Sequence, residues 1–226
     1  MKRIFCTLFA LMFAVNVYAV NAPLTTRSDI RTAVLNQMEH ATAGTAILST
    51  TVVNEVINRA QLKVAYDFPA VEKLDTVTLN SVATPMYALP NDFLKLNFAI
   101  KVLGDTIMAI EYVPPQTLYN REGGRTANIS DNSQFSYPRY CFISKITNGG
   151  NVLPRIWFFP QAKSVGSPDV IVSYFAVPEE LNADTDTTEI AYEYREALVY
   201  WACSALAFRI GRHDMGMVYL LSLIHI

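Results

Sequence analysis

The stretch from Glu189 to Gly211, EIAYEYREALVYWACSALAFRIG, decides the fold that the sequence predicts. Apolar side chains recur in it every three or four residues, which is the spacing of one face of an α-helix, and Gly211 ends the pattern. The recurring residues are Ile190, Tyr194, Ala197, Leu198, Trp201, Ala205 and Phe208. A single helix cannot bury such a stripe by itself, so the predicted helix 189–211 must pack against other helices.

Two shorter helices are predicted near the beginning of the chain, over residues 28–41 and 50–66. Thr26 or Ser28 can cap the first helix, and residues 42–45 separate it from the second. The second helix has a convincing apolar stripe, formed by Val52, Val53, Val56, Ile57, Ala60 and Val64. Two amphipathic helices joined by a short turn are typical of an antiparallel hairpin, against which the closing helix can bury its stripe.

Between these helices the hydrophobic pattern changes to that of β-strands. Strand-like segments occur at 76–80, 86–89, 94–102, 106–112, 140–146, 155–160 and 169–176. The clearest alternation sets Lys95, Asn97 and Lys101 against Leu94, Leu96, Phe98, Ile100 and Val102. The sequence therefore predicts an α+β fold, in which an N-terminal helix hairpin and a long C-terminal helix pack together. An antiparallel β region, residues 76–176, is inserted between them in a single domain spanning 20–220.

Both ends of the chain have patterns that we expect to lie outside this domain. Residues 1–19 contain two cations, an apolar run and a small-residue site ending at Ala19, which is typical of a signal peptide, although a mis-called start is the alternative. The apolar run is too short to remain as a membrane anchor, so no membrane contact is expected of the mature protein. Residues 221–226 match the peptide encoded by a sequencing adaptor, so we expect an artefact there and a missing natural C-terminus.

The composition is that of a chain that folds. Of its 226 residues, 51% are hydrophobic and 17% charged, and 18 Lys and Arg face 20 Asp and Glu, giving a net charge of −2. These values exclude a disordered chain. They also argue against a surface that binds nucleic acid throughout, because the chain has no excess of positive charge to neutralise phosphates.

Side chains that carry catalysis are scarce. Within 20–220 the only histidines are His40 and His213, and no Gly-x-Ser-x-Gly motif is present. Cys141 and Cys203 fall in apolar segments, where small buried thiols are the expected role, and the sequence leaves open whether they pair. We therefore expect that the protein is not an enzyme.

Metal and cofactor motifs are equally weak. Asp184, Asp186 and Glu189 resemble a calcium loop only loosely, because its glycine and its terminal glutamate spacing are absent. We interpret residues 182–188 as a solvated linker in which Asp186 or Thr187 caps the last helix. No phosphate-binding loop is present, and we expect neither cofactor nor metal.

Aromatic residues give the stronger signal, with 12 Phe, 12 Tyr and 2 Trp. An excess of aromatic residues without catalytic groups is typical of a protein that binds other proteins. The candidates for core or interface positions are Trp157, Phe158, Tyr194, Leu198, Trp201 and Phe208.

Four motifs, taken in their order along the chain, resemble the head-to-tail adaptor (connector) proteins of tailed bacteriophages, particularly the short-tailed ones. They are residues 54–61 (NEVINRAQ), 87–94 (YALPNDFL), 155–160 (RIWFFP) and 193–202 (EYREALVYWA). The resemblance covers Leu24 to Gly216.

The resemblance implies a structural protein of the virion, assembled in the host cytoplasm as a ring of usually twelve copies. Such a ring binds the portal and the next tail protein, and DNA passes through it without sequence-specific contacts. The segment after the final helix is expected to extend into the portal, which makes His213 and Asp214 candidates for portal docking.

A second hypothesis stays open if the N-terminal signal is genuine. The chain would then be an exported, β-rich surface or glycan-binding protein of a bacterium, secreted, periplasmic or on the cell surface. Neighbouring portal and terminase genes would favour the adaptor.

Overall fold

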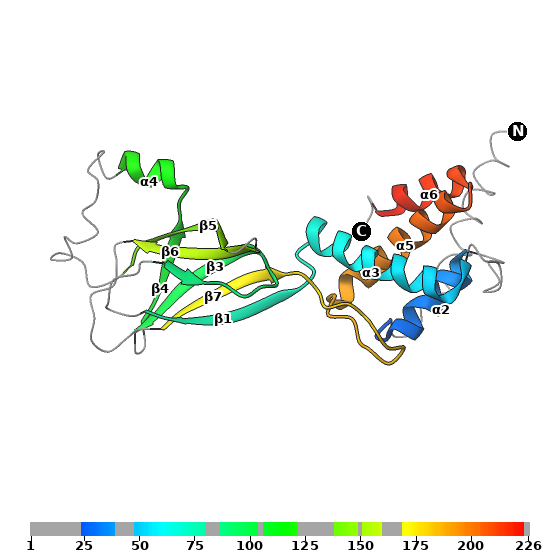
Figure 1. The fold of residues 1–226 in the computed structure, drawn as a ribbon, viewed down its shortest axis with the longest axis horizontal. Coiled ribbons are helices and arrows are strands. Elements are labelled where there is room, and N and C mark those ends of the chain that lie inside the picture. The colour runs from blue at the N-terminus through cyan, green and yellow to red at the C-terminus, as the bar shows by residue number, and fades with distance from the viewer. Residues whose placement is uncertain are drawn as a thin grey trace, which may run out of the picture. The chain divides into compact units, whose positions relative to one another are not determined.

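The computed structural model describes residues 24–38, 48–79, 86–103, 106–121, 138–148, 151–159 and 169–223. The chain divides into two compact units (Figure 1). The helical unit comprises the chain up to Val71 together with the chain from Pro178, and the β unit comprises Glu72–Val177. The predicted signal-like segment 1–19 and His40 lie outside the described residues. A unit built of helices and a second unit built mainly of strands confirm the predicted α+β class.

The helical unit is built around helix α5 (Arg195–Arg209), which contacts α2 (Arg27–Gln37), α3 (Thr50–Asp67) and α6 (His213–Leu223). The first turn of α2 is closed by a capping box in which the Thr26 side chain accepts from the Asp29 N–H and the Asp29 carboxylate accepts from the Thr26 N–H. Ser49 caps α3 by accepting from the Val52 N–H. Both N-terminal helices therefore begin where a polar side chain satisfies a backbone donor.

In α3 the predicted apolar stripe is buried except for Val52. In α5 the prediction is only partly right, because Tyr194, Trp201, Ala205 and Phe208 are partly exposed and the buried face instead includes Ala202, Cys203 and Leu206. The core of the helical unit combines these two faces with one face of α2. Its fully buried members are Ile30, Val34, Val53, Ile57, Ala60, Ile190, Ala197, Leu198, Ala202, Cys203, Leu206 and Ala207. Helix α6 packs so closely against α5 that a Cβ on Gly216 would come within 2.9 Å of the Phe208 ring. Tyr219 of α6 donates its hydroxyl to the Gln37 carbonyl at 2.7 Å. These contacts explain why a glycine occupies the crossing of α5 and α6.

The C-terminal part differs from the predicted long helix 189–211. Regular α-helix begins only at Arg195, after a short 3₁₀ helix η2 (Tyr192–Tyr194), because the backbone at Ala191 is extended (φ −56°, ψ 145°) where its N–H donates to the Ala70 carbonyl. Gly211, at φ 79°, ends the helix as predicted. The chain then forms α6, so the expectation of an extended segment from His213 is wrong.

The connection between α2 and α3, residues 39–47, lies outside the described residues. The predicted N-terminal helix hairpin therefore stays a prediction. Helix α6 ends at Leu223, and residues 224–226 are also outside the described residues.

The β unit contains one seven-stranded sheet in the order β1-β7-β3-β4-β5-β6-β2. Its strands are β1 (Glu72–Thr78), β2 (Met86–Ala88), β3 (Phe93–Leu103), β4 (Thr106–Tyr112), β5 (Tyr140–Asn148), β6 (Asn151–Phe159) and β7 (Asp169–Ala176), and helix α4 (Pro115–Arg121) follows β4. The neighbouring strands are antiparallel except β4 and β5, which run parallel. The prediction of a wholly antiparallel region is corrected there, since the long connection through α4 permits a crossover.

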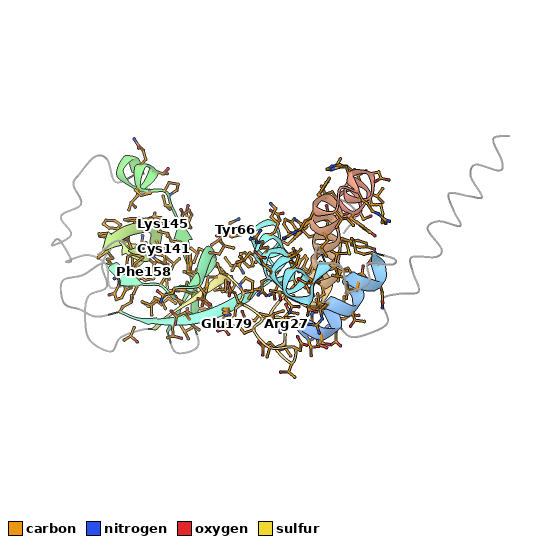
Figure 2. The ribbon with its side chains drawn as sticks, turned by 45° about the vertical axis from the view of Figure 1, so that its right-hand side comes forward. Arg27, Tyr66, Cys141, Lys145, Phe158 and Glu179 are labelled. Carbon is orange, nitrogen blue, oxygen red and sulfur yellow. The ribbon has the colours of Figure 1, made fainter. Side chains whose placement is uncertain are left out.

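One hydrophobic cluster joins the two halves of the sheet. Its members are Val77, Leu79, Leu89, Ala99, Ile110, Cys141, Ile156, Phe158, Val170 and Val172. Cys141 and Phe158, labelled in Figure 2, are ladder partners on β5 and β6. Because strands from both ends of the sheet contribute, the sheet curls around its own inner face.

In the second half of β3, from Phe98 onward, the apolar and polar residues lie on the opposite faces of the sheet from those that the alternation predicted. The pairing with β7 is irregular between Leu96 and Phe98, where a β-bulge shifts the register by one residue. After the bulge Ala99 and Lys101 face inward and are buried, whereas Phe98 is 42% exposed. The apolar residues Phe98, Ile100 and Val102 therefore lie on the outer face of the sheet, because a one-residue shift exchanges the two faces.

Leu198→Ala should destabilise the helical unit more than Trp201→Ala does. Leu198 is fully buried, so its truncation leaves a cavity and should lower the free energy of unfolding by about 2–5 kcal/mol. Trp201 is partly exposed, and part of its truncated volume opens to water. Urea unfolding of both variants measures the difference, and an equal or larger loss in Trp201→Ala would contradict this packing.

Candidate functional site

The segment that brings the chain back to the helical unit, residues 178–191, is held by charged side chains of α2. We call it the return segment. Arg31 donates to both carboxylate oxygens of Asp184, at 2.7 and 2.8 Å, and Arg27 donates to the same carboxylate at 2.8 Å. The hydrogen bonds from Arg31, followed by those from Arg27, hold the pKa of Asp184 well below its usual range. Asp184 thus fastens the return segment to the first helix.

Polar side chains of α3 fasten the same segment further along. Asn58 accepts the Leu181 N–H at 3.1 Å and donates to the Leu181 carbonyl at 3.3 Å, so it pairs with one backbone residue in both directions. Gln61, which is 1% exposed, accepts the Thr188 hydroxyl at 2.7 Å. Within the motif at 54–61, the apolar residues therefore belong to the core, and the amide side chains of Asn58 and Gln61 bind the return segment.

The predicted capping of the last helix by Asp186 or Thr187 is wrong. The Asp186 carboxylate accepts the N–H groups of Asn182 and Ala183, both at 2.7 Å, and so closes a turn within the return segment. Thr187 forms an isolated bridge with Thr26. These residues fix the shape of the return segment before the helix begins.

The described residues contain no group of three His, Cys, Asp or Glu side chains that could hold a metal ion. Cys141 and Cys203 are both free, and they belong to different units. Burial raises the pKa of each thiol to about 12. Both sulfurs are therefore protonated at neutral pH and poorly suited to act as nucleophiles.

The aromatic candidates of the β unit occupy opposite faces of the sheet. Phe158 is 2% exposed in the core. Trp157, next to it in sequence, points to the outer face, where its ring stacks on Phe142 at 5.4 Å and its Nε1–H donates to the Ser144 hydroxyl at 2.7 Å. Trp157 is partly exposed. Of the two, only Trp157 is available to a partner.

The candidates of the helical unit also divide between core and surface. Leu198 is buried, and Tyr194 stacks on Phe68 at 5.5 Å between ring centres. Phe208 and His213 are brought together, with ring centres 5.8 Å apart. His213 and Asp214 are exposed in the first turn of α6, not on an extended segment.

Several exposed apolar residues were not predicted from the sequence as surface residues. In the helical unit Tyr66 (Figure 2) is 64% exposed and Tyr192 is 75% exposed, with the Arg195 guanidinium 5.8 Å from the Tyr192 ring centre. In the β unit the most exposed are Leu74 and Ile107, both at 68%. Large apolar side chains that water can reach are typical of sites where other proteins bind.

The described residues thus expose large apolar side chains in both units and contain no cluster of metal-binding side chains. The model of the SU10 adaptor protein family matches residues 25–219, which spans both units. The chain belongs to the SU10 adaptor protein family. This match confirms the predicted relationship to phage head-tail adaptors, a structural and non-enzymatic class, while the restriction to short-tailed phages stays a prediction.

The remaining comparisons add two findings. No curated protein matches the chain. Within the part of the chain that the structure describes, no helix is both long enough and apolar enough to cross a membrane. The alternative of an exported surface or glycan-binding protein receives no support from these results.

Asp184→Asn should make the protein less stable at neutral pH and flatten its stability profile in acid. A carboxyl whose pKa is lowered in the folded state stabilises the protein above its unfolded pKa, and this contribution is lost as the pH falls below about 4. Urea unfolding between pH 7 and pH 2.5 measures the effect. Asp75→Asn is the matched control, since Asp75 has no arginine partner among the described contacts; a parallel loss in both variants would contradict the role of Asp184.

Proposed function

We propose that the protein is a subunit of a ring that connects the portal of a bacteriophage head to its tail. The observation that carries this proposal is the family match over residues 25–219, because it includes both the helical unit and the β unit. The exposed apolar residues of both units support it, since a ring subunit must contact its neighbours on two sides. We propose twelve copies, in line with the resemblance of the sequence to connector proteins.

The partners that we propose are the portal protein on one side of the ring and the next tail protein on the other. His213 and Asp214 remain candidates for portal docking, now as the exposed first turn of α6. A slightly acidic chain has little electrostatic attraction for the phosphates of DNA. The net charge of −2 therefore suits a ring through which DNA passes without being held. We propose the virion as the site of action.

Purified protein should form closed rings in negative-stain electron micrographs and should co-sediment with the portal protein encoded in the same genome. His213→Ala combined with Asp214→Ala should weaken the co-sedimentation and leave the rings intact, because both side chains are exposed. A chain that stays monomeric at all concentrations, or that binds glycans and not the portal, would contradict the proposed function.

A further inference from the structure

Strand β4 has an open edge along half of its length. It pairs with β3 from Thr106 to Ile110, but with β5 only at Glu111 and Tyr112. Glu111 and Val113 donate their N–H groups toward the β5 side, to the carbonyls of Arg139 and Cys141 at 2.9 Å. Since backbone groups alternate along a strand, the N–H and C=O groups of Ile107 and Ala109 point to the same side. Among the described residues, no strand pairs with them there.

Within the described part of the chain, this edge lacks the usual protection against another strand. Exposed edges in natural proteins carry charges, prolines or bulges that prevent pairing. The residues from Thr106 to Ile110 are uncharged, and Ile107 and Met108 are 68% and 42% exposed. They have high β propensity and contain no proline, which is the pattern of a strand that readily accepts a partner.

Strand β1 forms the other edge of this half of the sheet, and unlike the open stretch of β4 it carries charged side chains. Among the described strands, β1 pairs with β7 alone, and it carries Glu72, Lys73 and Asp75. The Thr76 N–H donates to the neighbouring Asp75 carboxylate at 2.8 Å, an exposed contact that an incoming carbonyl can replace. Two of these charges point away from the open side of β1, because Lys73 donates to Asp92 and the Glu72 carboxylate accepts from Asn97 and Ser173. The β1 and β4 edges therefore differ, as the two sides of a head-to-tail contact do.

The strand directions make these two edges fit. β1, β7, β3 and β4 are neighbours in this order, and each is antiparallel to the next. A second copy placed beside the first in the same orientation brings its β1 next to β4 with the opposite direction, which is the antiparallel arrangement. Its outer face also continues that of the first copy, so that Leu74 joins the exposed apolar row of Phe98 and Ile107.

We propose that the open edge of β4 pairs with the β1 edge of a second copy of this chain. This inference rests on the proposed function, because such a head-to-tail contact leaves a β4 edge free at one end and a β1 edge free at the other end of every open chain of copies, and pairs all of them only when a ring closes. The paired stretch is short, since β5 occupies β4 from Glu111 onward. It supplies the directional backbone contact, and the apolar outer face supplies buried area.

Ala109→Pro and Ile107→Lys test the edge in the full-length protein. Proline removes a donor that faces away from β3, and lysine places a charge on the open edge, so neither change disturbs the existing ladder. Both variants should keep the parent's far-UV circular dichroism and melting temperature, but sediment as monomers at concentrations where the parent forms rings. Val218→Lys is the matched control, because Val218 is 60% exposed on α6 in the other unit, and it should assemble normally.

Disulfide trapping identifies the occupant of the edge. Cysteine is placed at Leu74 or Thr76 of β1 and at Ile107 or Ala109 of β4, in all four pairs. Within one chain the two strands are separated by β7 and β3, about 14 Å, which is too far for a disulfide. At least one pair should give a ladder of cross-linked multimers on oxidation, and each single variant should not.

The outcomes separate this inference from the proposed function. Rings that persist in both edge variants, or that form without any cross-link in the four pairs, overturn the pairing and leave the ring proposal standing. Cross-links in a single variant show two identical edges meeting, and also overturn it. Intact rings that lose only portal binding assign the edge to another protein, whereas a parent chain that never oligomerises overturns both proposals.

Discussion

Helix α5 packs against α2 and α3, which lie far earlier in the sequence, and the rest of the structure depends on this constraint. Leu198 and Leu206 of α5 are fully buried. The chain must therefore come back to its first helices after the whole β unit has been completed. Closing so large a loop carries an entropic penalty, which the buried apolar area of three helices offsets.

The return segment shows how that closure is made specific. A hydrophobic face alone fixes neither the register nor the path of an incoming chain. Here Asn58 and Gln61 recognise individual backbone and hydroxyl groups of the return segment, while Arg31 and Arg27 hold its carboxylate. Helix α3 thus contributes one face to the core and another to the docking of the chain, which gives the motif at 54–61 a structural explanation.

Most of the fold could be predicted from periodicity, and the errors have identifiable physical causes. The stripe of α3 is buried as its spacing indicated, and strands occur in all the predicted strand segments. The stripe predicted for α5 is only partly buried, because α5 is packed against α2, α3 and α6 and its buried face is wider than one stripe and differently placed. Periodicity could not reveal the bulge after Leu96, because the pattern Leu96, Phe98, Ile100 continues undisturbed while the backbone shifts by one residue. Nor could it place the start of α5, since the tertiary hydrogen bond at Ala191 overrides the local pattern.

The candidate surfaces were harder to predict than the fold for the same reason. Ile107 and Leu74 look like core residues in sequence, and only the sheet order shows that their face is exposed. Asp184 is exposed, as the interpretation of residues 182–188 as a solvated linker predicted, but its ion pairs could not be predicted, because its arginine partners are more than 150 positions away. Long-range pairing of this kind leaves no signal in a single sequence.

The β unit is joined to the helical unit through its two neighbouring strands β1 and β7, in which Glu72 pairs with Phe175. Its two ends therefore lie about 5 Å apart, one step of the ladder. A module whose ends meet can be exchanged for another of different length without altering the path of the chain around it. A change in the length of the β unit can therefore be accommodated without moving the end of α3 or the start of the return segment.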